Sequence, residues 1–335
     1  MAFQSGATYG YNRVSQNQLM AACQFIDDIT ECFKHTILPS NSLLQVADYG
    51  CSEGINSITI FSEVFSKFRK SSKNPIMITH TDLPKNDWVE FNNFIQTSEK
   101  SYLKINNVYY STIGRSYFNQ IFPKESIHIA YASYSMHYLS AKPKRNPGEY
   151  FWVFPNLITQ ACKDMKQLLN LRIEEIITGG YFFFIINARE NINEDPSLSR
   201  YSFNVIKKLM DRGDVLPDEF TNFVWQSFPY HITEIQKILQ ELNGRIEIIK
   251  CEYGKILSPY YSEYLETNDI DAFEKKITDM IVVRMKNALF SCLLRSEEEK
   301  MRILCMALDE IKLTIRNEIQ PFYQDYIVVI LKKIS

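Results

Sequence analysis

The sequence predicts an α/β protein with a doubly wound sheet and helices on both faces. Three observations support this prediction. Strand-like and helix-like segments alternate through the first half of the chain. Two of the strand-like runs have a central stretch that is apolar throughout, as strands buried on both faces do. A turn with two glycines joins the first strand to a helix, which is typical of α/β proteins that bind nucleotide-like ligands.

Seven segments are predicted as strands because apolar and β-branched residues are concentrated in them. In chain order they are Leu43–Ala47, Pro75–Thr81, Asn107–Ser111, Ile127–Ser133, Gly180–Ala188, Arg245–Tyr253 and Asp325–Lys332. Phe183–Ile186 and Ile327–Leu331 contain no polar residue, so we expect them in central or near-central strands.

Helices are predicted where apolar residues recur at helical spacing. The clearest are Ser15–Phe33, Asn56–Phe68, Asp87–Thr97 and Pro155–Ile177. Residues 189–244 and 255–317 are also helical in pattern, rich in aromatic residues, and fit the sheet poorly. We expect them to form a helical lid over an acceptor pocket, on a core of residues 1–188, 245–254 and 318–335. A peripheral dimerisation layer is the alternative interpretation.

Composition excludes several classes of protein. The 335 residues carry a formal net charge of −2 without a long basic run, so no nucleic-acid partner is expected. The seven cysteines are scattered and form no CxxC pair, which predicts neither a disulfide framework nor a zinc site and favours a reducing compartment. No apolar run reaches the roughly 18 residues of a membrane span. These features predict a soluble, cytoplasmic protein without a membrane partner.

The most informative segment is Val46–Ile58, where an apolar run stops at the sequence DYGCSEGIN. Gly50 and Gly54 in this turn allow close approach of a ligand to the backbone, and the following helix points free N–H groups at it. A purely structural turn is equally consistent with this pattern alone. Asp82 ends the next strand, where an acid accepts hydrogen bonds from ribose hydroxyls. Alternatively, Asp82 or Asp87 caps the following helix.

Five blocks follow one another along the first half of the chain: Tyr9–Gln16 (YGYNRVSQ), Asp48–Asn56 (DYGCSEGIN), Asp82–Trp88 (DLPKNDW), Arg115–Phe118 with Ile121–Pro123, and Ser133–Ser140 (SYSMHYLS). Taken together and in this order, they resemble the SABATH family of S-adenosylmethionine-dependent carboxyl methyltransferases. The resemblance is specific over residues 9–140 and extends to the remaining residues only in general plan. It implies a Rossmann-like methyltransferase sheet of seven strands with a helical lid.

The resemblance also implies S-adenosylmethionine as cofactor. By this comparison, Asp48 and Asn56 hold its methionine end. Asp82 with Leu83 binds the ribose and adenine, and Ser116 with Tyr117 the adenine ring. The expected cofactor-binding residues are therefore Tyr9, Asp48, Gly50, Asn56, Asp82, Leu83, Ser116 and Tyr117. We expect Cys51 to be a small packed residue rather than a nucleophile.

On the acceptor side, Gln16, His137 and Tyr138 match the family positions that bind a carboxylate, with Tyr138 in place of the usual tryptophan. Trp225 and Phe228 are candidate pocket walls, although core packing is equally consistent. A carboxylate has a reference pKa of about 4 and needs no general base at neutral pH, so alignment is expected to dominate catalysis. No ligand set for a metal is found.

The leading hypothesis is methylation of a small apolar or aromatic carboxylic acid to its methyl ester. Two alternatives are N-methylation of a small heterocycle and a non-catalytic protein that binds S-adenosylmethionine. The resemblance also leads us to expect a homodimer. Arg13 either pairs with an acidic substrate or lies on the surface.

Overall fold

A computed structural model describes residues 10–36, 38–146, 148–149, 152–192 and 197–335. Its central feature is a seven-stranded sheet in the order β3-β2-β1-β4-β5-β7-β6. The strands are β1 (Leu44–Tyr49), β2 (Ile76–Asp82), β3 (Val108–Gly114), β4 (Ile127–Ser133), β5 (Ile176–Asn187), β6 (Ile246–Leu257) and β7 (Tyr323–Lys333). The sheet confirms the predicted fold class, and each strand overlaps its predicted segment.

Strands β1 to β5 are parallel, whereas β7 runs antiparallel to both β5 and β6. The apolar run Ile327–Leu331 explains the position of β7 between β5 and β6, because these five residues are buried throughout. The carboxyl ends of the five parallel strands therefore meet at one edge of the sheet, where ligands bind in open α/β sheets.

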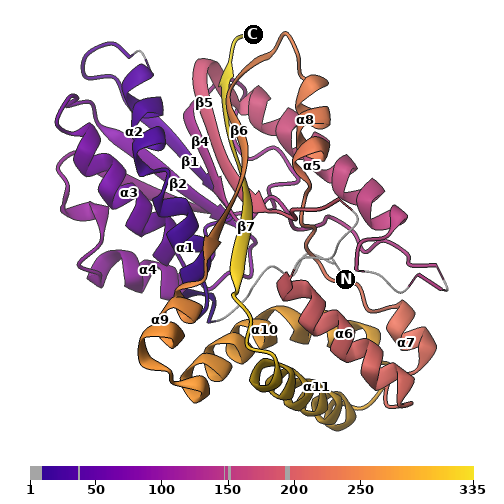
Figure 1. Cartoon of the computed structure of the whole chain (residues 1–335). Helices are drawn as coiled ribbons and strands as arrows, with labels where there is room; N and C mark the ends of the chain where they lie inside the picture. The colour runs from indigo at the N-terminus through magenta and orange to yellow at the C-terminus, as the bar shows by residue number, and fades with distance from the viewer. Residues whose placement is uncertain (1–9, 37, 147, 150–151, 193–196) are drawn as a thin grey trace.

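Helices cover both faces of the sheet and its carboxyl edge (Figure 1). On one face lie α1 to α4, on the other α5 and α8, and below the strands α6, α7, α10 and α11. Their bounds are α1 Gln16–Cys23, α2 Ile26–His35, α3 Ile55–Phe68, α4 Trp88–Thr97, α5 Pro155–Glu175, α6 Ser197–Asp211, α7 Pro217–Thr221, α8 Ile232–Gln240, α9 Pro259–Thr267, α10 Ile270–Cys292 and α11 Glu297–Asn317, with short 3₁₀ helices η1 Tyr11–Arg13 and η2 Tyr102–Lys104.

Several element boundaries differ from the predictions, and tertiary contacts explain two of the differences. The predicted helix Ser15–Phe33 is divided into α1 and α2 at Phe25, whose ring packs against Phe183 and Tyr326 at centroid distances of 6.0 and 5.6 Å. Turning the chain here buries Phe25 against the sheet. Strand β5 begins at Ile176 rather than Gly180, because Ile176 already pairs with β4 directly after α5 ends.

The helices at the carboxyl edge come from both segments predicted to form the lid. Helix α11 packs against α6 and α10, so the two segments form one layer. Helix α8 falls within the predicted lid range 189–244, but it packs against α5 and β6 and covers the sheet instead. One apolar core continues from α5 into this layer and includes Leu168, Phe203 and Leu304.

Candidate functional site

The turn after β1 requires glycine at its first position. Gly50 has a φ of +86°, and a Cβ atom there would lie 2.3 Å from Cβ of Ser135. Its N–H donates to the carbonyl of Thr81 at the end of β2 at 2.7 Å. This glycine lets the turn pass between the ends of β2 and β4, and so opens the space beside α3 to a ligand.

Asp82 faces this turn from the end of β2. Its two carboxylate oxygens accept from the backbone N–H groups of Ser52 and Leu83, each at 2.7 Å. Burial raises the pKa of the Asp82 carboxyl to about 6, although the two hydrogen bonds oppose the rise. Asp87 accepts from the N–H of Glu90 at 2.9 Å and caps α4. Of the two acids, Asp87 is the cap and Asp82 remains for a ligand.

Asp48 is held by a buried hydrogen-bonded chain. Its Oδ2 lies 2.7 Å from Nδ1 of His80, and Nε2 of His80 lies 2.6 Å from the hydroxyl of Tyr102. Cys51 completes a compact group with Asp48 and His80. Burial raises the pKa of the Cys51 thiol well above its ordinary value, so the thiol is protonated, as expected for a packed residue.

The N-terminal segment is fixed over this turn by Glu53, a residue that no sequence pattern singled out. Its carboxylate accepts from the N–H groups of Gly10 and Asn12 at 2.6 and 2.9 Å. In return, Oδ1 of Asn12 accepts from the N–H of Ile55 in the first turn of α3 at 3.2 Å. These contacts bring the intervening Tyr11 into the pocket.

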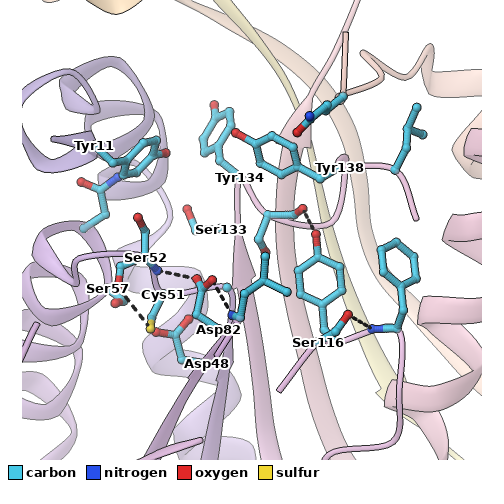
Figure 2. Close-up of a pocket in the computed structure, with 18 residues that line it drawn as sticks. Tyr11, Asp48, Cys51, Ser52, Ser57, Asp82, Ser116, Ser133, Tyr134 and Tyr138 are labelled. Atoms are coloured by element: carbon cyan, nitrogen blue, oxygen red, sulfur yellow. Dashed lines mark hydrogen bonds between the residues drawn. The ribbon is translucent and has the colours of Figure 1, made fainter. Parts of the chain in front are cut away.

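A cavity of about 800 Å³, counted to its open mouth, lies where these segments meet. Figure 2 shows Tyr11, Tyr134 and Tyr138 at its upper end and the carboxylates of Asp48 and Asp82 at its lower end. The lining residues are Tyr11, Asp48, Gly50, Cys51, Ser52, Asn56, Ser57, Asp82, Leu83, Ser116, Tyr117, Phe118, Ser133, Tyr134, Ser135, Tyr138, Leu139 and Gln226.

The chemistry of this cavity fits a polar ligand with hydroxyl and amino groups. The buried hydroxyls of Ser52 and Tyr134 have no hydrogen-bond partner among the described residues. Buried polar groups are normally paired, so unpaired hydroxyls at both ends of the cavity, Ser52 near the carboxylates and Tyr134 near the other tyrosines, indicate a ligand that supplies the missing partners. Aromatic rings at the upper end add an apolar surface.

A family model described as "SAM dependent carboxyl methyltransferase" matches residues 4–333. The chain belongs to this family, SABATH. Among relatives, anthranilate O-methyltransferase 2 of Zea mays is 24% identical over 69% of this chain and 70% of its own length. The salicylate/benzoate carboxyl methyltransferase of Arabidopsis thaliana is 25% identical over 66% and 64%. A solved loganic acid methyltransferase with SAH superposes with a TM-score of 0.75 at 17% identity, covering 99% of this chain and 98% of that one.

This SAM-dependent carboxyl methyltransferase brings together most of the residues predicted to bind the cofactor. They line the cavity from three separate segments of the chain: Asp48, Gly50 and Asn56; Asp82 and Leu83; and Ser116 and Tyr117. Tyr9 lies outside the described residues. The hydroxyl of Tyr117 donates to the carbonyl of Ser135 at 2.8 Å, which fixes the orientation of its ring.

Only one residue of the predicted acceptor set, Tyr138, lines the cavity. Gln16 is exposed at the start of α1 and is absent from the described lining. His137 is buried, and its Nδ1 and Nε2 lie 3.3 and 3.1 Å from the backbone and side-chain nitrogens of Asn187. Burial and, to a smaller extent, the charge of Arg284 lower the pKa of His137 to about 3, so the ring is neutral.

The two candidate pocket walls pack elsewhere. The Trp225 ring lies 4.8 Å from that of Trp152, and Phe228 is fully buried with its ring 4.8 Å from that of Tyr230. Neither is among the described lining residues, so the structure places both in packing contacts. In the described part of the chain, no helix is long and apolar enough to cross a membrane.

Proposed function

We propose that this enzyme transfers the methyl group of S-adenosylmethionine to the carboxylate of a small apolar or aromatic acid and releases a methyl ester. The observation that carries this proposal is the set of residues that line the cavity. Tyrosine rings lie at one end, and the carboxylates of Asp48 and Asp82, which would bind the cofactor, lie at the other. No histidine, lysine or arginine is among the described residues that line it. An ionised carboxylate is an acceptor that requires no such base.

The cofactor supplies a methyl group on a positively charged sulfur. Asp82 would accept hydrogen bonds from the ribose, because its carboxylate oxygens face the cavity and the N–H groups of Ser52 and Leu83 keep it in place. Asp48 would accept from the methionine amino group, in an orientation set by His80. Tyr117 would pack its fixed ring against the adenine.

On the acceptor side, the enzyme would act by alignment. The hydroxyl of Tyr138, which lines the cavity, would donate to the acid, and the rings of Tyr11 and Tyr134 would enclose its apolar part. The helices at the carboxyl edge of the sheet would exclude water from the nucleophilic oxygen. His137, whose ring centroid is 4.8 Å from that of Tyr138, would support the tyrosine from the core.

A panel assay tests this proposal directly. The purified protein is incubated with methyl-labelled S-adenosylmethionine and benzoic, hydroxybenzoic, aminobenzoic, indolic, isoprenoid and fatty acids, and the labelled product is then treated with base. We expect at least one acid to give a labelled product that base hydrolyses. A base-stable product would indicate N-methylation, and no product from any acid would refute the proposed activity.

We also propose a homodimer, on the basis of the family resemblance. Light scattering after size-exclusion chromatography is expected to give about twice the chain mass of 39.3 kDa. A mass equal to one chain at micromolar concentration would contradict this expectation.

A further inference from the structure

Arg284, on helix α10, lies outside the described lining of the cavity, but its charge acts on three tyrosines of that lining, Tyr11, Tyr134 and Tyr138. Arg284 is half-buried and lies one helical turn after Met280, whose sulfur accepts from the side-chain amide of Asn17 at 3.5 Å. With the Gln18 amide oriented so that its nitrogen donates to the Ser15 carbonyl at 3.1 Å, its oxygen accepts from the Arg284 guanidinium. These contacts place Arg284 on the face of α10 that meets α1.

The charge of Arg284 reaches the residues around the predicted acceptor position. Burial raises the pKa values of Tyr11, Tyr134 and Tyr138, and the positive charge of Arg284 opposes this rise in all three. Asp82 acts on Tyr138 in the opposite direction. Tyr138 is therefore within electrostatic reach of both the lid cation and the carboxylate of the cofactor end.

Arg284 is half-buried, and no carboxylate of the described residues pairs with it, in contrast to Arg295 and Arg316 of the same layer. Arg295 is paired with Glu219 at 2.6 Å, and Arg316 is paired with Asp271 at 2.5 Å. A half-buried guanidinium with an amide oxygen as its polar partner keeps unused donors and an uncompensated charge. An anionic ligand would accept hydrogen bonds from these donors and would neutralise the charge.

We propose that Arg284 binds the carboxylate of the acceptor acid and thereby selects anionic acceptors over neutral heterocycles. This inference rests on the proposed function, since it assigns the anion-binding residue of that same site. A guanidinium matches a carboxylate in charge and in the spacing of two parallel hydrogen bonds. Arg13, the other arginine considered from the sequence, is exposed. Binding by Arg284 leaves the second carboxylate lone pairs available for attack on the methyl group.

The test compares binding of benzoate, salicylate and anthranilate with binding of their neutral amides to the SAH-loaded protein by calorimetry. The wild type is expected to bind at least one acid more tightly than its amide. Arg284→Met should weaken binding of that acid about 10- to 100-fold, the range for one charge-assisted hydrogen bond, and should leave amide and SAH affinities unchanged. Arg284→Lys should retain part of the preference.

Lys286→Met is the matched control. Lys286 is exposed and lies two residues after Arg284 on α10, and the substitution removes one positive charge, as Arg284→Met does. It should behave as wild type. Equal binding of the acid by wild type and Arg284→Met, or no preference for any acid in the wild type, would overturn the inference. A clear Arg284-dependent preference without ester formation would instead overturn the proposed activity alone.

Discussion

At the scale of single residues, we expect Asp82 to make cofactor binding dependent on pH. Only the ionised carboxylate accepts two hydrogen bonds from a ribose, and burial raises the Asp82 pKa to about 6. We expect the affinity for SAH to be constant above pH 7 and to fall about tenfold per pH unit below pH 6. Calorimetry between pH 5 and 8 measures this, with Asp82→Asn expected to bind weakly and without this pH dependence.

The same group affects stability with the opposite sign. Because the pKa of Asp82 is about 6 in the folded apo protein and its ordinary value is 3.8, the folded state binds more protons between these values. Its contribution to the free energy of unfolding therefore increases as the pH falls from about 6 to about 4. Chemical denaturation of the apo wild type and of Asp82→Asn should show this difference, and a decrease specific to the wild type would contradict it.

Glu53 supports a second residue-scale prediction. Removing its carboxylate in Glu53→Ala leaves the N–H groups of Gly10 and Asn12 unpaired and releases Tyr11 from the cavity. We expect the KM for the acceptor and the Kd for SAH both to rise about tenfold, which corresponds to the cost of one lost buried partner. Glu63→Ala, an exposed acid on α3, is the control. Unchanged constants in Glu53→Ala would show that Tyr11 needs no such anchor.

At the scale of elements, the turn between β1 and α3 has no room for a side chain at Gly50. Gly50→Ala adds left-handed backbone strain, roughly 1–3 kcal/mol, and a contact of 2.3 Å with Ser135. Gly213→Ala at φ +84° adds the strain alone, because no atom lies within 4 Å of the position that its Cβ would occupy. Thermal unfolding should therefore show a larger loss for Gly50→Ala, and SAH binding should be lost only there.

The end of α5 fixes the loop that carries Ser116 and Tyr117. Arg172 donates to the Tyr117 carbonyl at 2.8 Å and pairs with Glu175 at 2.9 Å, both side chains being fully buried. Glu175→Gln should lower the free energy of unfolding by about 3–5 kcal/mol, since it leaves a buried guanidinium without a counter-ion. The exposed neighbour allows a matched control, Glu174→Gln, with an expected change below about 1 kcal/mol in urea denaturation.

Elements and site were not equally predictable. Strand positions followed from apolar runs, and the cofactor turn followed from blocks in which glycine and aspartate have specific backbone roles. The division of Ser15–Phe33 was missed because helical periodicity continues through Phe25, and only tertiary contacts with the sheet explain the turn. Arg284 was missed because no motif marks it, and the face that α10 presents to α1 depends on packing.

At the scale of the whole molecule, the cofactor site joins the sheet to the N-terminal segment, so ligand binding should stabilise the entire fold. At 100 times its Kd, SAH is expected to increase the free energy of unfolding by about 2.7 kcal/mol, as mass action requires for a single site. Thermal unfolding across an SAH titration measures the effect. Asp82→Ala should show no increase, and an increase equal to wild type would place the cofactor elsewhere.

The position of β7 has a consequence for synthesis of the chain. Strand β7 lies between β5 and β6 in the sheet, yet 65 residues separate the end of β6 from its start. At 5–20 residues per second, a ribosome needs roughly 3–13 s to produce them. During this interval β5 and β6 present unpaired edges, which favour aggregation. A chaperone that covers exposed strands should therefore raise the soluble yield of this enzyme.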